Sequence, residues 1–209
     1  MTKLLIARHG NTFDKGDTLL RVGKRTDLPL SVSGKEQAIK LGEYLAKEHP
    51  QIDEVFSSSL VRTIDTAQIA VDTMDQHDIT VMPSDIFDEI DYGPDEGKPE
   101  NEVVARVGED AIKKWDEQAV APDGWLVDVE KLKYNWKEFT DSIKDSDEVI
   151  LVVTSNGTAR FVPYILDDVS EFISNNNIKL STGAVSCLSF KDGKWDVEYW
   201  NRKPKDYLG

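Results

Sequence analysis

The sequence predicts an α/β fold, a three-layer α/β/α sandwich with a mostly parallel central sheet and a helical insertion. Two observations predict it. Short apolar runs typical of buried strands alternate with longer segments of helical periodicity, and 39% of the 209 residues are hydrophobic, which is enough to fill a sizeable core. We therefore expect a single domain over residues 1–209, with ligands binding beyond the carboxyl ends of its parallel strands.

The first part of the chain contains three predicted strands and two predicted helices. Ser33 and Glu36 fit a capping box, which places a helix start there, and Pro50 marks the end of that helix. Apolar residues recur at three-four spacing from Leu60 to Met74, which predicts a second helix. We expect strands over residues 3–7, 53–56 and 79–82, and helices over residues 33–49 and 60–74.

A wholly helical, amphipathic insertion is predicted over residues 99–147, with a break at 122–124. It contains three of the five tryptophans, which we expect to pack as core residues; the alternative is a lid that shapes a ligand pocket. A continuous apolar strand over 149–153 and a helix from about Gly157 follow. Residues 183–199 are typical of a hairpin that turns at Asp192-Gly193.

The net charge of the chain argues against some classes of binding partner. Lys and Arg number 25 against 39 Asp and Glu, a net charge of −14, which argues against nucleic acid and anionic membranes as partners. The first apolar stretch is too short for a signal-peptide core, and no run reaches bilayer length, so we expect a cytoplasmic protein. The single cysteine, Cys187, excludes an intramolecular disulfide and is expected to be a buried, inert thiol.

Reactive residue types fall at the ends of three predicted strands. Arg8-His9-Gly10 follows the first strand, residues 57–62 follow the second, and residues 155–157 follow the strand over 149–153. Arginine offers a planar fork for phosphate oxygens, and histidine is a nucleophile or base near neutral pH. On the tripeptide alone, a histidine held by a backbone carbonyl for structural reasons fits equally well.

Five segments, in order, resemble motifs of the histidine phosphatase superfamily, the group that includes the phosphoglycerate mutases. Residues 4–12, LLIARHGNT, resemble its signature. The other four segments lie at residues 27–38, 57–67, 88–97 and 152–157. Each match is weak alone, but together and in this order they are specific, and they cover most of the chain outside the helical insertion.

The resemblance implies a role for each matched residue. His9 attacks phosphorus and becomes a phosphohistidine, while Arg8 and Arg62 hold the phosphoryl oxygens. Glu89 protonates the leaving oxygen and then deprotonates the attacking water. Phosphoryl transfer needs mainly placement and charge neutralisation, so these residue types suit the chemistry. The assignment of Glu89 depends on the resemblance, because four other acids in the same loop are rivals: Asp88, Asp91, Asp95 and Glu96.

Asn156 departs from the family pattern, which presents a second histidine at that position. The remaining histidines, His49 and His77, lie at no predicted strand end. Asparagine caps helices well, and its amide also donates a hydrogen bond to phosphate, but without a positive charge. Losing that charge should cost about 1–3 kcal/mol, or roughly ten- to two-hundredfold in rate. We expect a weakened enzyme with Asn156 as a phosphate ligand.

Further substrate contacts are predicted at Asn11, Gly157, Arg21 and Arg25. The two arginines lie in the loop before Asp27, where they either approach a distal charge of the substrate or remain solvated. Lys15 stands where the mutases usually carry an asparagine.

The insertion contains only one arginine, Arg106, where the mutases have an adjacent pair. Both differences weaken a mutase assignment.

The leading hypothesis is a phosphoric monoester hydrolase acting on a small phosphorylated substrate or phosphopeptide. We expect no metal, because no His, Asp and Glu cluster has ligand spacing, and no organic cofactor. Two alternatives stay open: a phosphoglycerate-type phosphomutase, and a phosphate-ligand binding protein that lost turnover together with the second histidine.

Overall fold

The computed structural model describes residues 1–208, and its centre is a six-stranded sheet with the strand order β3-β2-β4-β1-β5-β6. The first four strands in that order are mutually parallel, whereas β5 runs antiparallel to β1 and to β6. The predicted mostly parallel α/β sheet is therefore confirmed. The strands are β1 (Lys3–Arg8), β2 (Glu54–Ser57), β3 (Val81–Pro83), β4 (Val149–Thr154), β5 (Val185–Lys191) and β6 (Lys194–Arg202).

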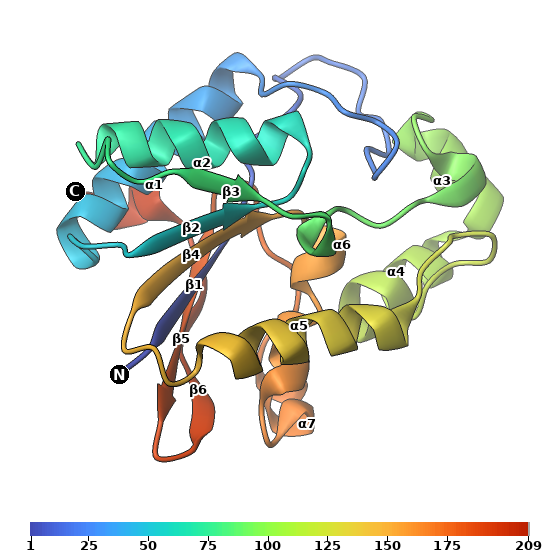
Figure 1. The fold of residues 1–209 in the computed structure, drawn as a ribbon. Coiled ribbons are helices and arrows are strands. Elements are labelled where there is room, and N and C mark those ends of the chain that lie inside the picture. Colours follow the sequence, from blue (N-terminus) through green and yellow to red (C-terminus); the bar gives the residue numbers. More distant parts are fainter. Residues whose placement is uncertain (209) are drawn as a thin grey trace.

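Helices cover both faces of the sheet, as a three-layer sandwich requires. Figure 1 shows α1 and α2 side by side on one face and α5 and α7 on the other, while α3 and α4 lie beyond one end of the sheet. The helices are α1 (Val32–Glu48), α2 (Val61–Thr73), α3 (Glu100–Val107), α4 (Glu109–Gln118), α5 (Val129–Ile143), α6 (Asn156–Ala159) and α7 (Val169–Asn175). Short 3-10 turns occupy Asp85–Phe87, Gly93–Asp95, Val162–Ile165 and Pro204–Asp206.

The central strand β1 divides the core into two parts. Successive side chains of a strand point to opposite faces, so Leu4 and Ile6 pack with the tryptophan-rich side, and Leu5 and Ala7 pack under α1 and α2. A strand buried on both faces appears in the sequence as a continuous apolar run. Cys187 belongs to the second part of the core, and burial raises the pKa of its thiol to about 12, in agreement with the predicted inert thiol.

The start of α1 differs from the predicted capping box. The N-cap is Ser31, whose hydroxyl accepts a hydrogen bond from the Gly34 amide at 3.2 Å, and the helix begins at Val32. Asp14, from the loop after β1, accepts hydrogen bonds from the amides of Val32 and Ser33. A carboxylate distant in sequence thus binds the first amides of the helix, including the Ser33 amide to which Glu36 was predicted to reach back.

The insertion is divided more finely than predicted. Gly108, with φ of 85°, separates α3 from α4, and Ala119, in the left-handed conformation, ends α4. The non-helical break between α4 and α5 is accordingly wider than residues 122–124. The helix expected from about Gly157 is a single turn, α6, followed by a 3-10 turn and α7.

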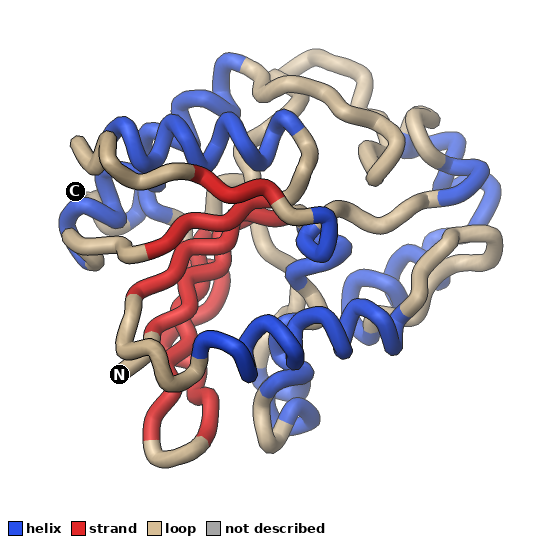
Figure 2. The backbone as a smooth tube through the Cα atoms, viewed as in Figure 1, coloured by secondary structure: helices blue, strands red, loops and turns tan. Residues whose placement is uncertain are grey.

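The order of the strands brings the carboxyl ends of β2, β4 and β1 next to one another. The long loop between β1 and α1, tan in Figure 2, passes over this end of the molecule toward α3, and a β-bridge joins Leu20 to Pro99. Within residues 1–208, no helix combines the length and apolar character needed to cross a bilayer.

Candidate active site

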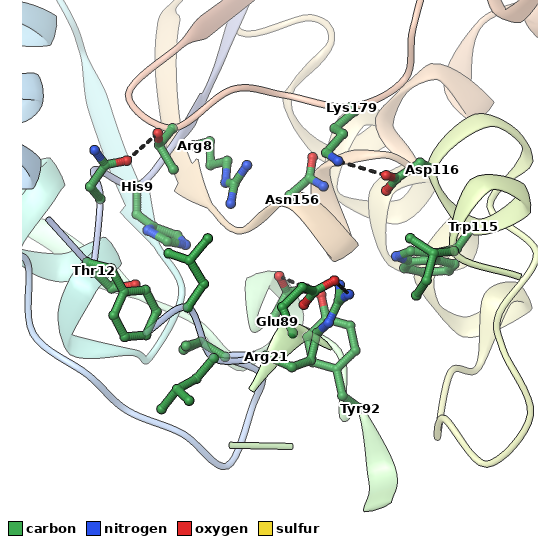
Figure 3. Close-up of a pocket in the computed structure, with 18 of the residues that line it drawn as sticks. Arg8, His9, Thr12, Arg21, Glu89, Tyr92, Trp115, Asp116, Asn156 and Lys179 are labelled. Atoms are coloured by element: carbon green, nitrogen blue, oxygen red, sulfur yellow. Dashed lines mark hydrogen bonds and ion pairs between the residues drawn. The ribbon is translucent and has the colours of Figure 1, made fainter. Parts of the chain in front are cut away.

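A cavity of about 370 Å³ opens at the carboxyl ends of β1 and β4. Its wall combines the predicted residues Arg8, His9, Asn11, Arg21, Glu89 and Asn156 with side chains from the insertion and from the segment after α7. Figure 3 shows His9 and Arg8 on one side of this space and Trp115, Asp116 and Lys179 on the other, with Asn156 and Glu89 between. The convergence predicted from three strand ends is therefore present for β1 and β4.

The hydrogen bonds of His9 indicate which ring nitrogen carries the proton and which carries the lone pair. Nδ1 lies 2.7 Å from the carbonyl oxygen of Gly10, so we assign the proton to Nδ1, which leaves a lone pair on Nε2. Burial, followed by the positive charges of Arg62 and Arg8, holds the pKa of His9 well below 6.5. The imidazole is therefore neutral at pH 7. The carbonyl contact expected of a structural histidine is the same contact that leaves the lone pair on Nε2.

Gly10 itself is required by packing. A Cβ atom at this position would lie 2.3 Å from the carbonyl oxygen of Gly34. The close approach of these two backbones holds the loop after β1 against the start of α1, and only glycine permits it.

Buried histidines should make the fold sensitive to mild acid. Burial lowers the pKa of both His9 and His49 below 6.5, so the folded protein binds fewer protons than the unfolded chain as the pH falls through that value. We expect the free energy of unfolding to decrease between pH 7.5 and about pH 5.5. Thermal unfolding across this range measures the effect. His49→Gln should reduce the decrease, because it removes one of the two histidines whose pKa burial lowers. A Tm that rises as the pH is lowered from 7.5 to 5.5 would contradict the lowered pKa values of His9 and His49.

Arg8 is the last residue of β1, and only part of its guanidinium is hydrogen-bonded. Nη1 donates to the carbonyl oxygen of Leu180 at 2.7 Å, while the buried Nε has no hydrogen-bond partner within residues 1–208. Figure 3 shows the guanidinium directed into the space between His9 and Asn156. An unpaired buried donor is costly, and an anion bound beside His9 would satisfy it.

Arg62 is not among the residues that line the cavity, but it contacts His9, which is. Its side chain is fully buried in the first turn of α2, and Nη1 and Nη2 donate to the carbonyl oxygens of Thr26 and Gly23 at 2.9 and 3.3 Å. Nε donates to Nε2 of His9 at 3.3 Å. Two carbonyl oxygens of the loop before α1 thus occupy Nη1 and Nη2 of Arg62. Only the Nε–H group of Arg62 is directed at Nε2 of His9.

Glu89 is the one acid of its loop that reaches the cavity. Oε1 accepts from the Ile90 amide at 2.9 Å, and Oε2 accepts from the Gly157 amide at 3.2 Å and from the Tyr92 hydroxyl at 3.4 Å. Burial raises the pKa of Tyr92, so its hydroxyl stays protonated as a donor. The four rival acids all have partners elsewhere: Asp88 binds Ser59, Asp91 binds Arg25, Asp95 binds Arg106 and Trp125, and Glu96 binds Arg25 and Thr26.

Gly157 positions Glu89, and the structure does not place it on the cavity wall as a substrate contact. A Cβ atom here would lie 2.1 Å from Oε1 of Glu89 and 2.9 Å from Cγ1 of Ile90. We expect Gly157→Ala to displace the carboxylate and to lower kcat by roughly 10²-fold, because catalytic groups tolerate little misplacement. In a Glu89→Gln background the same substitution should cause little further loss. Additive losses would show that Gly157 acts independently of Glu89.

Asn156 is the first residue of α6, and Ser155 is the N-cap, so the capping role considered for Asn156 is wrong. Oδ1 of Asn156 accepts a hydrogen bond from the Leu180 amide at 2.8 Å. Because the oxygen is engaged, the carboxamide nitrogen is the end available to a ligand. Asn156 therefore offers the cavity a neutral donor.

The other predicted substrate contacts divide into two groups. Asn11 and Arg21 line the cavity. The Asn11 side chain binds Ser33 and Thr182, and Arg21 pairs with Glu100. Arg25 is exposed, pairs with Asp91 at 2.9 Å and is not part of the wall, so the prediction that it approaches the substrate is not supported.

Sequence reasoning missed several charged residues of the wall: Glu100, Asp116, Arg160 and Lys179. Arg160 had a detectable signal, because it follows Asn156 by four residues, the interval that places side chains on one face of a helix. Lys179 had none, since it lies in an irregular segment after α7. Arg106, the arginine of the insertion, pairs with Asp95 and stays outside the cavity.

Comparisons with known proteins identify a family and individual relatives. A sequence model described as the histidine phosphatase superfamily (branch 1) matches residues 4–203. A 2,3-bisphosphoglycerate-dependent phosphoglycerate mutase of Borreliella afzelii is 29% identical over 83% of this chain and 69% of its own length. The corresponding mutase of Buchnera aphidicola is 34% identical over 54% of this chain, and the match spans about half of its length, 48%.

Solved structures share the fold at low identity. A mycobacterial glucosyl-3-phosphoglycerate phosphatase in complex with VO3 superposes with a TM-score of 0.77 at 20% identity, covering 96% of this chain and 98% of that chain. The α-ribazole phosphatase of Shigella flexneri gives a TM-score of 0.72 at 19% identity, covering 96% of each chain. A phosphoserine phosphatase of Entamoeba histolytica gives 0.74 at 22% identity, covering 96% and 97%.

Proposed function

The chain belongs to the histidine phosphatase superfamily, and on that premise we propose that it hydrolyses phosphomonoesters through a phosphohistidine on His9. One observation carries the proposal. A neutral imidazole presents Nε2 to a cavity that also exposes the Arg8 guanidinium, and Arg62 donates to the same nitrogen. Two positive charges beside an unprotonated ring nitrogen suit a phosphate dianion and its transfer.

The first chemical step transfers the phosphoryl group to the protein. The Nε2 lone pair forms the P–N bond as the bond from phosphorus to the leaving oxygen breaks. Glu89, protonated in this step, gives its proton to that oxygen, and the alcohol departs. The guanidinium groups of Arg8 and Arg62 neutralise charge on the phosphoryl oxygens, and the Asn156 amide donates a hydrogen bond to them.

The second step returns the protein to its starting state. Glu89, now a carboxylate, takes a proton from water as the water oxygen forms a bond to phosphorus and the P–N bond breaks. Inorganic phosphate leaves with His9 neutral and Glu89 protonated again. The amides of Ile90 and Gly157 fix the Glu89 carboxyl for both roles.

Transfer to water is favoured over transfer back to a sugar acid by the composition of the insertion. Its arginine, Arg106, pairs with Asp95 outside the cavity, and α4 contributes Trp115 and Asp116 to the wall instead of an arginine pair. Similarity to mutases in sequence and to phosphatases in fold is compatible with either reaction.

The test is release of inorganic phosphate from 4-nitrophenyl phosphate by the wild-type protein, with and without glycerate, a sugar acid that carries no phosphate of its own, as an acceptor. We expect phosphate and 4-nitrophenol in equal amounts under both conditions. Transfer of phosphate to the acid in place of release would favour the mutase alternative. Binding of inorganic phosphate without any turnover would favour the binding-protein alternative and contradict the proposal.

A further inference from the structure

Arg160 is a buried cation in the cavity wall without a full counter-charge. It is 1% exposed, and its Nε and Nη1 donate to the backbone carbonyl oxygens of Asn156 and Trp115. The carboxylate nearest to its guanidinium is that of Asp116, at 3.8 Å from Nη2, which is longer than a hydrogen bond. Neutral acceptors satisfy the N–H groups of Arg160 but leave its charge unbalanced.

Asp116 is already committed to a second cation. Nζ of Lys179 lies 2.7 Å from Oδ2 of Asp116, so two positive side chains share one carboxylate. Arg21, on another part of the wall, differs because it pairs one to one with Glu100. Glu89 also lines this cavity and acts electrostatically on Arg160. With Glu89 protonated, as the proposed first step requires, the Arg160–Lys179 wall carries an excess of one positive charge, and burying such a charge is unfavourable unless a partner arrives.

The guanidinium of Arg160 is also fixed in place. It lies over the indole ring of Trp115, with 3.9 Å from Cζ to the ring centroid. Side chains that are already ordered lose little freedom when they bind a ligand. The excess charge is thus presented from a rigid support, as a recognition site requires.

The geometry separates this wall from the reacting nitrogen. Figure 3 places Lys179, Asp116 and Trp115 across the cavity from His9 and Arg8. A ligand with its phosphoryl group at His9 would extend its other end toward the Arg160–Lys179 wall. This orientation rests on the proposed function, which places the phosphoryl group.

We propose that Arg160 and Lys179 bind a carboxylate at the distal end of the substrate, so that the preferred substrates are phosphomonoesters of carboxylic acids. One carboxylate balances the single excess charge, whereas a second phosphate group would bring two negative charges beside Asp116 and Glu89. The planar fork of Arg160 matches a carboxylate, and Lys179 adds a flexible point charge at the rim.

The test compares two compounds with the same skeleton, 3-phosphoglycerate and glycerol 3-phosphate, which differ in a carboxylate and a hydroxymethyl group. For the wild type we expect kcat/KM to be roughly ten- to a hundredfold higher for the carboxylate, mostly through KM, because a charged hydrogen bond is lost in the other compound. Arg160→Gln should remove most of this ratio, and Arg160→Lys should keep part of it.

Two exposed lysines give a matched comparison that does not depend on a buried substitution. Lys179 and Lys194 are 45% and 51% exposed, and each pairs with one aspartate, but only Lys179 faces the cavity. Lys179→Gln should lower the ratio of the two kcat/KM values, and Lys194→Gln should leave it at the wild-type value. An equal fall in both variants would overturn the proposal.

The outcomes separate this inference from the proposed function. Hydrolysis of both compounds by the wild type with equal kcat/KM would overturn the distal carboxylate site and leave the phosphatase proposal intact. If the wild type hydrolyses neither compound nor 4-nitrophenyl phosphate, the phosphatase proposal fails, and calorimetric Kd values for the two compounds then decide. Tighter binding of 3-phosphoglycerate, lost in Lys179→Gln, would support the site, and equal binding would overturn it.

Discussion

Replacing His9 with alanine should reduce kcat for 4-nitrophenyl phosphate by at least about 10³-fold, because removing a covalent nucleophile eliminates both steps of the reaction. Within the cavity wall, no second histidine is present among residues 1–208 to take over. The measurement is steady-state release of 4-nitrophenol at saturating substrate, supported by single-turnover rates.

The control for that variant is another buried histidine. His49 lies at the end of α1, where Nε2 contacts the Tyr199 hydroxyl at 2.9 Å, and it is not part of the cavity. His49→Ala should lower stability without changing kcat by more than a few-fold. If His9→Ala retained the wild-type rate, the mechanism would be wrong.

Replacing Asn156 with histidine should raise the rate, by roughly ten- to two-hundredfold. A protonated imidazole donates to the ligand through an N–H that carries positive charge, which the Asn156 carboxamide lacks. This gain comes at the cost of the hydrogen bond that Oδ1 of Asn156 now accepts from the Leu180 amide. Arg8 shares Leu180 with this residue and opposes protonation of the new ring, whereas a bound phosphate dianion favours it.

Asn156→Asp is the matched control, because a carboxylate can also accept from the Leu180 amide but repels phosphate. Its rate should fall below that of the wild type, while Asn156→His rises above it. The comparison is made through kcat/KM for the same aryl phosphate, with Tm measured to confirm folding. An equal or lower rate in Asn156→His would show that the missing charge does not limit the enzyme.

The parts of the fold that could be predicted are those whose signal is local or strongly periodic. β1 and β4 are buried on both faces, so each is a continuous apolar run, and Asp192-Gly193 turns the predicted hairpin. The capping box at Ser33 was not found, because Ser31 is the N-cap of α1 and Asp14 from the loop after β1 accepts from the first amides of the helix. Two features of the insertion could not be predicted: the separation of α3 from α4, and the early end of α4. A left-handed residue such as Ala119, which ends α4, carries no clear sequence signal.

The candidate site likewise contains some residues whose positions could be predicted from the sequence and others whose positions could not. His9 and Asn156 were predictable because each lies one or two residues beyond the end of a strand, and parallel strand ends meet at one edge of a sheet. The orientation of Arg62 was not, because carbonyls of the loop over residues 23–26 compete for its N–H groups. The roles predicted for these residues in catalysis stay predictions until variants are assayed.

The most direct test of the central claim is to trap the phosphorylated protein. Wild-type protein mixed rapidly with substrate and quenched in alkali should carry a phosphoryl group that is stable in base, labile in acid and located by mass spectrometry on His9, at a level that rises in a Glu89→Gln variant if water attack is slowed. Turnover with no phosphorylated protein, or with the phosphoryl group on another residue, would contradict the account.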